Sequence, residues 1–118
     1  CVAVVGARGE VMSLVDRSVQ LYVRRCLTTD PAELIAKVEC PTLIISGGRD
    51  IQISVDNAER LFSSSKGAKH ISFADMSHVL KDATTDDRIE QMLSVYTNSQ
   101  LPLTEGLADA IVEFLKSL

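Results

Sequence analysis

The chain has 118 residues, a net charge of −4 and only 4% aromatic residues. An acidic balance with few aromatic rings argues against a surface that follows nucleic-acid phosphates or stacks bases, so no nucleic-acid partner is expected. No run of about 18 apolar residues is present, which argues against a membrane span. The sequence has three cysteines, Cys1, Cys26 and Cys40, and none of them forms a C-x-x-C pair. They indicate buried thiols rather than a disulfide framework or a zinc site, and no cofactor or metal is expected.

The first third of the chain predicts one strand followed by two helices. Residues 2–5 form a short continuous apolar run, which is typical of a strand buried on both faces of a parallel sheet. Between residues 11 and 26, apolar side chains recur at helical spacing and predict an amphipathic helix. Residues 31–38 predict a second, short helix, with Asp30 as its N-cap and Glu33 positioned to close a capping box.

The remainder of the chain alternates between strands and helices. Residues 42–46 are the clearest strand, because they are β-branched, apolar on both faces and followed by a Gly-Gly pair. A helix is predicted for residues 55–64 and another strand for residues 70–73. Residues 82–103 could place apolar side chains on one helical face, but their flanks resemble loops. Thr104 is positioned to cap a final helix that runs to the C-terminus.

This order of elements predicts an α/β fold, in which parallel strands form a sheet flanked by helices. Three strands are few for such a sheet, and an exposed edge invites pairing with another strand. The missing strands are expected before residue 1 or on another chain. The sequence also starts on a strand without Met, which indicates a fragment, a processed chain or a trimmed one. Any targeting signal would then be missing, and a cytoplasmic location is slightly favoured.

Two loops that follow strands carry side chains able to act together. In a parallel sheet, functional residues gather beyond the carboxyl ends of the strands, where neighbouring loops meet. Asp50 follows the strand at residues 42–46, and His78 follows the strand at residues 70–73. A carboxylate that accepts a hydrogen bond from Nδ1–H fixes the tautomer of an imidazole and leaves Nε2 free to take a proton from a nucleophile. The pattern alone leaves open that Asp50 is a turn residue and His78 a surface histidine.

Two stretches of sequence carry a family resemblance. Residues 40–53 read CPTLIISGGRDIQI, and residues 76–81 read MSHVLK. The first resembles the approach to the catalytic acid, and the second the histidine loop, of the α/β-hydrolase superfamily in its esterase- or serine-aminopeptidase-like branch. The resemblance implies a catalytic triad in which Asp50 is the acid and His78 the general base, in the chain order Ser, acid, His.

The resemblance also implies a domain organisation. Residues 1–118 would be the C-terminal segment of an α/β-hydrolase domain, a partial fold of parallel strands with flanking helices and a helical cap-like insertion. Residues 1–9 would supply a strand, residues 10–38 the cap-like helices, and residues 39–118 the strand–helix units that bear the acid and the histidine. The apolar face of the helix at residues 11–26 could line an acyl pocket or simply pack on the sheet.

The nucleophile of such a triad is missing from the sequence. No Gly-x-Ser-x-Gly elbow occurs anywhere in the 118 residues. Ser13 lacks the flanking glycines and belongs to a helical pattern, Ser46 ends a strand, and Ser77 adjoins His78, so that an extended loop would point the two side chains apart. The resemblance implies that the nucleophile and the oxyanion loop belong to a part of the parent protein outside these residues.

Two functions from different classes follow from these observations. In the first, the full domain is a serine hydrolase that cleaves an ester, thioester or amide bond of a small-molecule acyl substrate, with Asp50 orienting His78. In the second, the chain is a non-catalytic, hydrolase-like fragment that serves as a binding or dimerisation module and forms a homodimer through its exposed sheet edge. A flavodoxin- or receiver-like domain ranks lower, because residues 7–9 offer no acidic or phosphate-binding cluster.

The remaining polar groups favour structural roles. His70 begins a strand and is interpreted as a structural or surface histidine. Arg49 and Lys81 flank the acid and the base and could form salt bridges or steer an anionic substrate, although solvent exposure is the expectation. The acidic residues near the ambiguous segment are interpreted as a solvated face, because no His or Cys joins them at ligand spacing: Asp86, Asp87 and Glu90.

Overall fold

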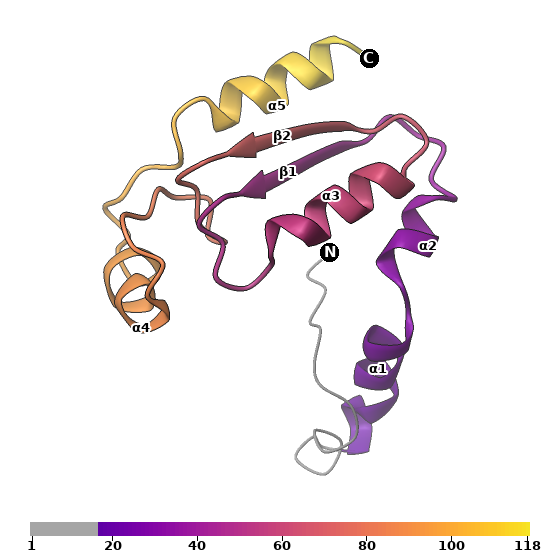
Figure 1. Ribbon diagram of the computed structural model, residues 1–118, viewed down its shortest axis with the longest axis horizontal. Coiled ribbons are helices and arrows are strands. Elements are labelled where there is room, and N and C mark those ends of the chain that lie inside the picture. Colours follow the sequence, from indigo (N-terminus) through magenta and orange to yellow (C-terminus); the bar gives the residue numbers. More distant parts are fainter. Residues whose placement is uncertain (1–16) are drawn as a thin grey trace.

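The computed structural model describes residues 17–118, in which short helices alternate with two strands (Figure 1). The elements follow one another in this order: α1 (Arg17–Thr28), α2 (Pro31–Ile35), β1 (Leu43–Gly47), α3 (Val55–Ser64), β2 (Lys69–Phe73), α4 (Arg88–Gln91), the π-helical turn η2 (Met92–Tyr96) and α5 (Leu107–Lys116). The strand predicted for residues 2–5 lies outside the described residues.

The two strands form a parallel pair, in which Leu43 lies beside Lys69 and Gly47 beside Phe73. Each strand was predicted to within one residue at its ends. The continuous apolar run that leads through β1 is typical of a parallel strand covered on both faces, whereas β2 alternates polar and apolar residues. The α/β fold class with parallel strands and flanking helices is therefore confirmed for the described part of the chain.

One edge of β1 has no partner strand among the described residues. The carbonyl of Thr42 accepts a hydrogen bond from the N–H of Lys69 at 2.9 Å, so even-numbered residues of β1 direct their backbone groups to β2. Backbone groups alternate in direction along a strand, so those of Leu43 and Ile45 point to the opposite edge. Within residues 17–118 no strand pairs with that edge. The described sheet is therefore narrower than a free-standing parallel sheet needs to be.

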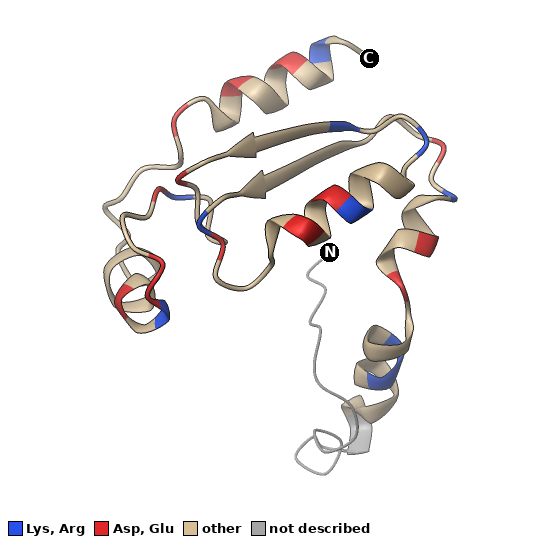
Figure 2. Ribbon diagram, viewed as in Figure 1, with Lys and Arg blue, Asp and Glu red and all other residues tan. Residues whose placement is uncertain are grey.

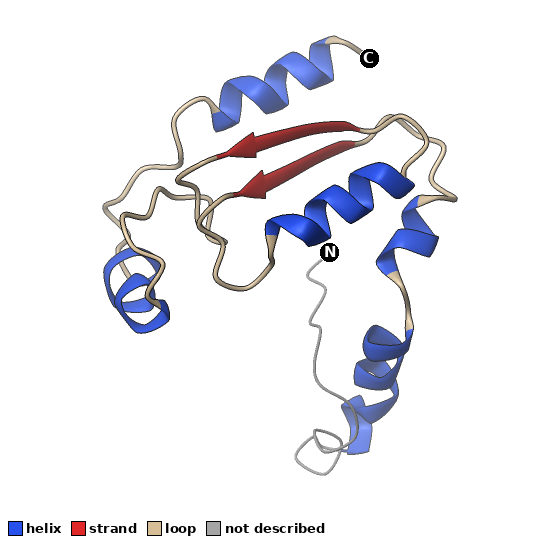
Figure 3. Cartoon of the chain, viewed as in Figure 1, coloured by secondary structure: helices blue, strands red, loops and turns tan. Residues whose placement is uncertain are grey.

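Helices α3 and α5 lie on opposite sides of the strand pair (Figures 1 and 3). Helix α3, predicted with the same bounds, buries Ala58 and contacts β1. Helix α5 buries Leu107, and Gly106 at its start lies next to the ring of Phe73. This sandwich of one helix on each face is what two apolar strand faces require.

The start of α5 differs from the prediction. Its N-cap is Gly106 with φ of 78°, not Thr104. Thr104 is buried instead: its N–H donates to Leu80 O at 2.9 Å and its hydroxyl donates to Asp82 Oδ1 at 2.7 Å. The capping prediction was wrong because these distant partners, which local sequence does not reveal, take up the hydroxyl.

The segment at residues 82–103 is only briefly helical. Asp87 caps α4, with its Oδ1 accepting from Glu90 N at 2.8 Å, and the helix widens into η2 after one turn. Loops enclose both short helices, as Figure 3 shows. The predicted shared apolar face is not buried as a whole, because Ile89 and Leu93 are 70% and 71% exposed while Val95 is buried.

Helix α2 begins as predicted, with Asp30 Oδ1 accepting from Ala32 N at 2.9 Å. It ends at Ile35 instead of residue 38, because the chain tightens into i→i+3 hydrogen bonds such as Lys37 N to Leu34 O at 3.0 Å.

Helix α1 lies away from the two strands in Figure 1. Its apolar side chains Leu21 and Tyr22 are 67% and 69% exposed, so the alternative in which this helix packs on the sheet is wrong for the described residues. Cys26 and Cys40 are likewise exposed, which corrects the expectation of buried thiols. For α1 the reason is that it makes no extensive contact with another described helix or strand. Cys40 lies outside α1, in the segment between α2 and β1. The first part of the predicted helix, residues 11–16, lies outside the description.

Charged side chains largely avoid the strands and lie on the helices and in the loops (Figure 2). Strand β1 carries no charge and β2 carries only Lys69, whereas the loops beyond the carboxyl ends of both strands carry several. Among the described helices, none has the length and apolar character needed to cross a bilayer.

Candidate active site

The loop that carries Asp50 lies directly against the loop that follows β2. Gly48 N donates to Phe73 O at 2.8 Å, and Arg49 N donates to Met76 O at 3.1 Å. Glycine is required for this approach, because a Cβ on Gly47 would lie 2.1 Å from Met76 O. The Gly-Gly pair thus lets the two loops share backbone hydrogen bonds instead of side-chain contacts.

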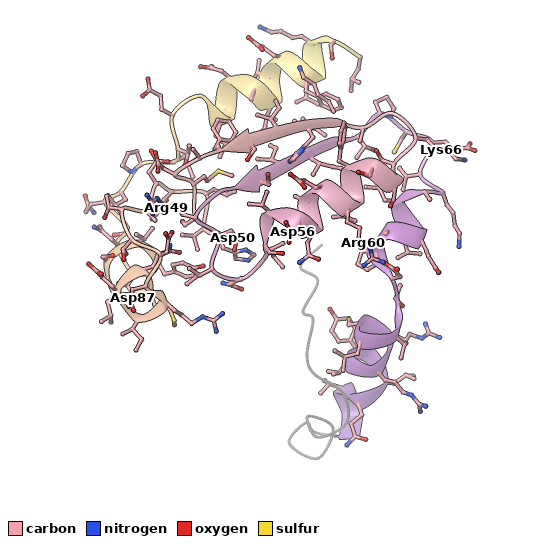
Figure 4. All side chains as sticks on the ribbon, viewed as in Figure 1. Arg49, Asp50, Asp56, Arg60, Lys66 and Asp87 are labelled. Atoms are coloured by element: carbon pink, nitrogen blue, oxygen red, sulfur yellow. The ribbon has the colours of Figure 1, made fainter. Side chains whose placement is uncertain are left out.

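Asp50 has a separate task for each carboxylate oxygen. Oδ1 accepts hydrogen bonds from the backbone N–H groups of Gln52 and Ile53 at 2.8 and 2.9 Å. Oδ2 lies 2.9 Å from His78 Nδ1. The two bonds to Oδ1 fix the rotamer of Asp50, and this rotamer directs Oδ2 toward His78. Figure 4 shows Asp50 and Arg49 together at the carboxyl ends of the strands.

His78 is held by a tightly closed loop. Ser77 donates to Lys81 O twice, from its N–H at 2.9 Å and from its hydroxyl at 2.7 Å. Ala83 N donates to Asp75 O at 2.8 Å, which closes the base of the loop. Ser77 is 1% exposed with its hydroxyl engaged in this way, so its role within the loop is structural.

The structure therefore brings together the two side chains that their loop positions predicted would meet. Both are mostly buried, with side-chain exposures of 13% for Asp50 and 24% for His78. A carboxylate on Nδ1 selects the tautomer that carries its proton there, so that Nε2 is an acceptor. No described residue forms a hydrogen bond with Nε2. The geometry is that of a carboxylate–imidazole pair in which Nε2 has no hydrogen-bond partner among residues 17–118.

A cavity of about 260 Å³ opens beside this pair, and residues of β1 form part of its wall. Its wall is mostly aliphatic, with a few polar groups at one end, a composition typical of ligand sites. The lining residues come from β1, from the loop that carries Asp50 (the acid loop), from α3 and from the loop that carries His78 (the histidine loop): Ile44, Ile45, Ser46, Gly47, Asp50, Ile53, Ser54, Ala58, Leu61, Met76, Ser77, His78 and Leu80.

A second serine–histidine contact occurs on the sheet itself. Ser46 Oγ lies 2.9 Å from His70 Nε2, and the ring of His70 lies 5.5 Å from that of Phe62 on α3. Within residues 17–118 no carboxylate contacts His70, so nothing there orients its imidazole as Asp50 orients His78. The pair satisfies two half-buried polar groups between the sheet and α3, which agrees with the structural interpretation of His70.

Arg49 is more than an exposed neighbour of the acid. Its Nε donates to Asp75 Oδ1 and its Nη1 to Asp86 Oδ1, both at 3.0 Å. The hydrogen bond that Arg49 donates to Asp75 raises the pKa of Arg49, and the charge of Asp86 adds to the shift. Lys81 is engaged too, with Nζ donating to Asn98 O at 2.6 Å. The expectation of solvent exposure was wrong for both residues, because their partners lie far away in sequence.

No sequence pattern pointed to Gln91, which is fully buried behind the loop that carries Asp50. Its Nε2 donates to Arg49 O at 3.0 Å and to Thr85 O at 2.9 Å. A glutamine in a four-residue helix has no distinguishing pattern, so only the fold identifies it. In the part of the chain from residue 17 onward, no group of three or more His, Cys, Asp or Glu side chains is arranged to hold a metal ion.

Comparison with known proteins adds no assignment: no family model, no curated protein and no solved structure matches the chain.

Proposed function

We propose that this chain is the C-terminal portion of a serine hydrolase with a partial α/β-hydrolase fold, and that it supplies the acid and the base of the catalytic triad. The substrate would be an ester, thioester or amide of a small molecule. One observation carries the proposal: Asp50 Oδ2 lies 2.9 Å from His78 Nδ1, while Nε2 is left free beside a cavity.

The chemistry follows from that geometry. In its Nδ1–H tautomer, His78 takes the proton of a serine hydroxyl at Nε2 while the serine oxygen forms a bond to the acyl carbon. Asp50 stabilises the imidazolium that results and keeps the ring in place. His78 then returns the proton to the leaving oxygen, sulfur or nitrogen as the bond to the acyl carbon breaks, and a water molecule later repeats the cycle on the acyl-enzyme.

The nucleophile in this proposal comes from outside the 118 residues. The hydroxyls of Ser46 and Ser77 are engaged by His70 and by Lys81 O. The open edge of β1 supports a wider sheet than the described one, on which a nucleophile-bearing turn could approach His78 from the cavity side. The exposed apolar face of α1 likewise fits a cap-like helix that packs against a part of the protein outside the described residues.

Labelling with a fluorophosphonate probe tests the proposal. The probe should modify one serine of the longest polypeptide that the gene encodes around these residues, at a position outside the 118. His78→Ala should slow labelling by about a thousandfold or more, because the triad acts as a unit. The isolated 118 residues should not be labelled. Labelling of the isolated chain that disappears in Ser46→Ala, or labelling of the full polypeptide that His78→Ala leaves unchanged, would contradict the proposal.

The open strand edge also supports the second function, a binding or dimerisation module. In that case two copies would pair through β1, and the pairing would not depend on Asp50 or His78. Light scattering coupled to size-exclusion chromatography separates the two. A monomer with a cooperative melt argues against obligatory pairing, whereas a stable dimer that persists in Asp50→Asn favours the module.

A further inference from the structure

Gln91 is the only polar side chain with no exposed surface among those described, and it lies behind the acid loop. Both hydrogens of its side-chain amide are in use, one on Arg49 O and one on Thr85 O. Its Oε1 is buried and has no partner among the described residues. An unsatisfied buried acceptor destabilises a fold, so its retention calls for a compensating role.

The orientation of this amide is determined by its surroundings. Rotating it by half a turn would place Oε1 against two carbonyl oxygens, those of Arg49 and Thr85, which repel it. The donating orientation is thus the only one that satisfies both carbonyls. Gln91 consequently acts as a clamp between the acid loop and the segment that begins at Thr85.

The atom that Gln91 holds belongs to the peptide unit that leads into Asp50. This unit is planar, so the direction of Arg49 C=O also sets the position of the Asp50 Cα. The other side of the same residue is held as well. Arg49 N donates to Met76 O, and its guanidinium contacts Asp75 at the start of the histidine loop and Asp86 beyond it.

We propose that Gln91 and Arg49 are positioning residues that set the distance and angle between Asp50 and His78. Gln91 fixes the acid loop from the buried side, and Arg49 ties that loop to the histidine loop through Asp75. Neither touches the reacting atoms. This inference rests on the proposed function, because the distance it concerns is that of the acid–base pair.

Proton NMR of the intact chain provides the test. A proton held between Nδ1 and a carboxylate gives a resonance far downfield, and His78→Ala assigns it by its loss. Gln91→Met keeps the volume but removes both donors and the unpartnered acceptor. We expect it to accelerate solvent exchange of the Nδ1 proton by about fivefold, the ratio that corresponds to one hydrogen bond of ordinary net strength. Arg49→Lys, which replaces the two-pronged contact by a single charge, should act in the same direction.

Val95→Ala is the matched control, because Val95 is 4% exposed in the next helical turn and its truncation destabilises the same region. Its exchange rate should stay within about twofold of the unmodified chain after correction for stability. If Gln91→Met and Arg49→Lys behave like Val95→Ala, the positioning role is wrong although the acid–base pair stands. If the imidazole nitrogen shifts of the unmodified chain report the Nε2–H tautomer of His78, the pair itself is absent and both proposals fail.

Discussion

Gly47 lies so close to Met76 that a methyl group on it would meet the Met76 carbonyl oxygen at 2.1 Å. This contact joins the end of β1 to the loop after β2 and thereby brings Asp50 within reach of His78. Gly47→Ala should therefore lower the free energy of unfolding by about 1–3 kcal/mol, the usual cost of overpacking, and shift the His78 resonances. Urea unfolding and NMR measure the two effects.

Gly67→Ala is the control for that substitution. A Cβ on Gly67 would meet nothing within 4 Å, but its φ of 91° strains any other residue, by about 1 kcal/mol. It should destabilise the chain without moving the His78 resonances. Equal effects of both substitutions on His78 would show that the spectrum reports only stability.

The carboxylate of Asp50 determines which ring nitrogen of His78 carries the proton. In Asp50→Asn the backbone bonds from Gln52 and Ile53 can remain on the amide oxygen, which turns the NH₂ group toward Nδ1. His78 should then change to the Nε2–H tautomer, which cannot accept a proton from a nucleophile. Nitrogen chemical shifts of the imidazole distinguish the tautomers, and the exposed Asp56→Asn should leave them unchanged.

Thr104 joins the end of the histidine loop to the start of α5. Thr104→Val removes the hydrogen bond to Asp82 Oδ1 at 2.7 Å, and we expect a loss of about 1–2 kcal/mol in the free energy of unfolding, because a hydrogen bond from a buried hydroxyl to a charged group is lost. Thr97→Val is the same change at an exposed site whose hydroxyl donates to Leu93 O. It should stay within about 0.5 kcal/mol, and a comparable loss at both sites would contradict the role given to Thr104.

The contribution of Arg49 to stability should depend on salt and not on pH in the neutral and mildly alkaline range. Its pKa is raised in the folded chain, chiefly by Asp75, so the stabilisation is fully present below the ordinary arginine pKa and is lost only as the pH rises through the higher folded value. The difference between the unmodified chain and Arg49→Gln should thus be the same at about pH 7 and about pH 10. It should shrink with added NaCl, because Asp75 and Asp86 are mostly exposed. Thermal melts at several pH values and salt concentrations measure both trends.

Local signals in the sequence predicted most of the helices and strands, and the loop positions together with the family resemblance selected the pair. The apolar run that became β1, the short alternating stretch that became β2 and the helical spacing that became α3 each depend on neighbouring residues alone, which is why their bounds were predicted closely. The loops that follow parallel strands lie at the same end of the sheet, so the sequence predicts that Asp50 and His78 approach each other, as they do in the structure.

Contacts between distant residues decided the rest. Thr104 could have capped a helix, but its hydroxyl binds Asp82, and Arg49 and Gln91 became part of the site only through Asp75, Asp86 and Thr85. Helix α1 kept its predicted amphipathic pattern, yet its apolar face stays exposed in the described chain. A periodic pattern indicates which residues share a face of a helix or strand, and a position in a loop indicates which residues can approach one another. Partners that lie far apart in the chain are selected by packing, which only the folded backbone determines.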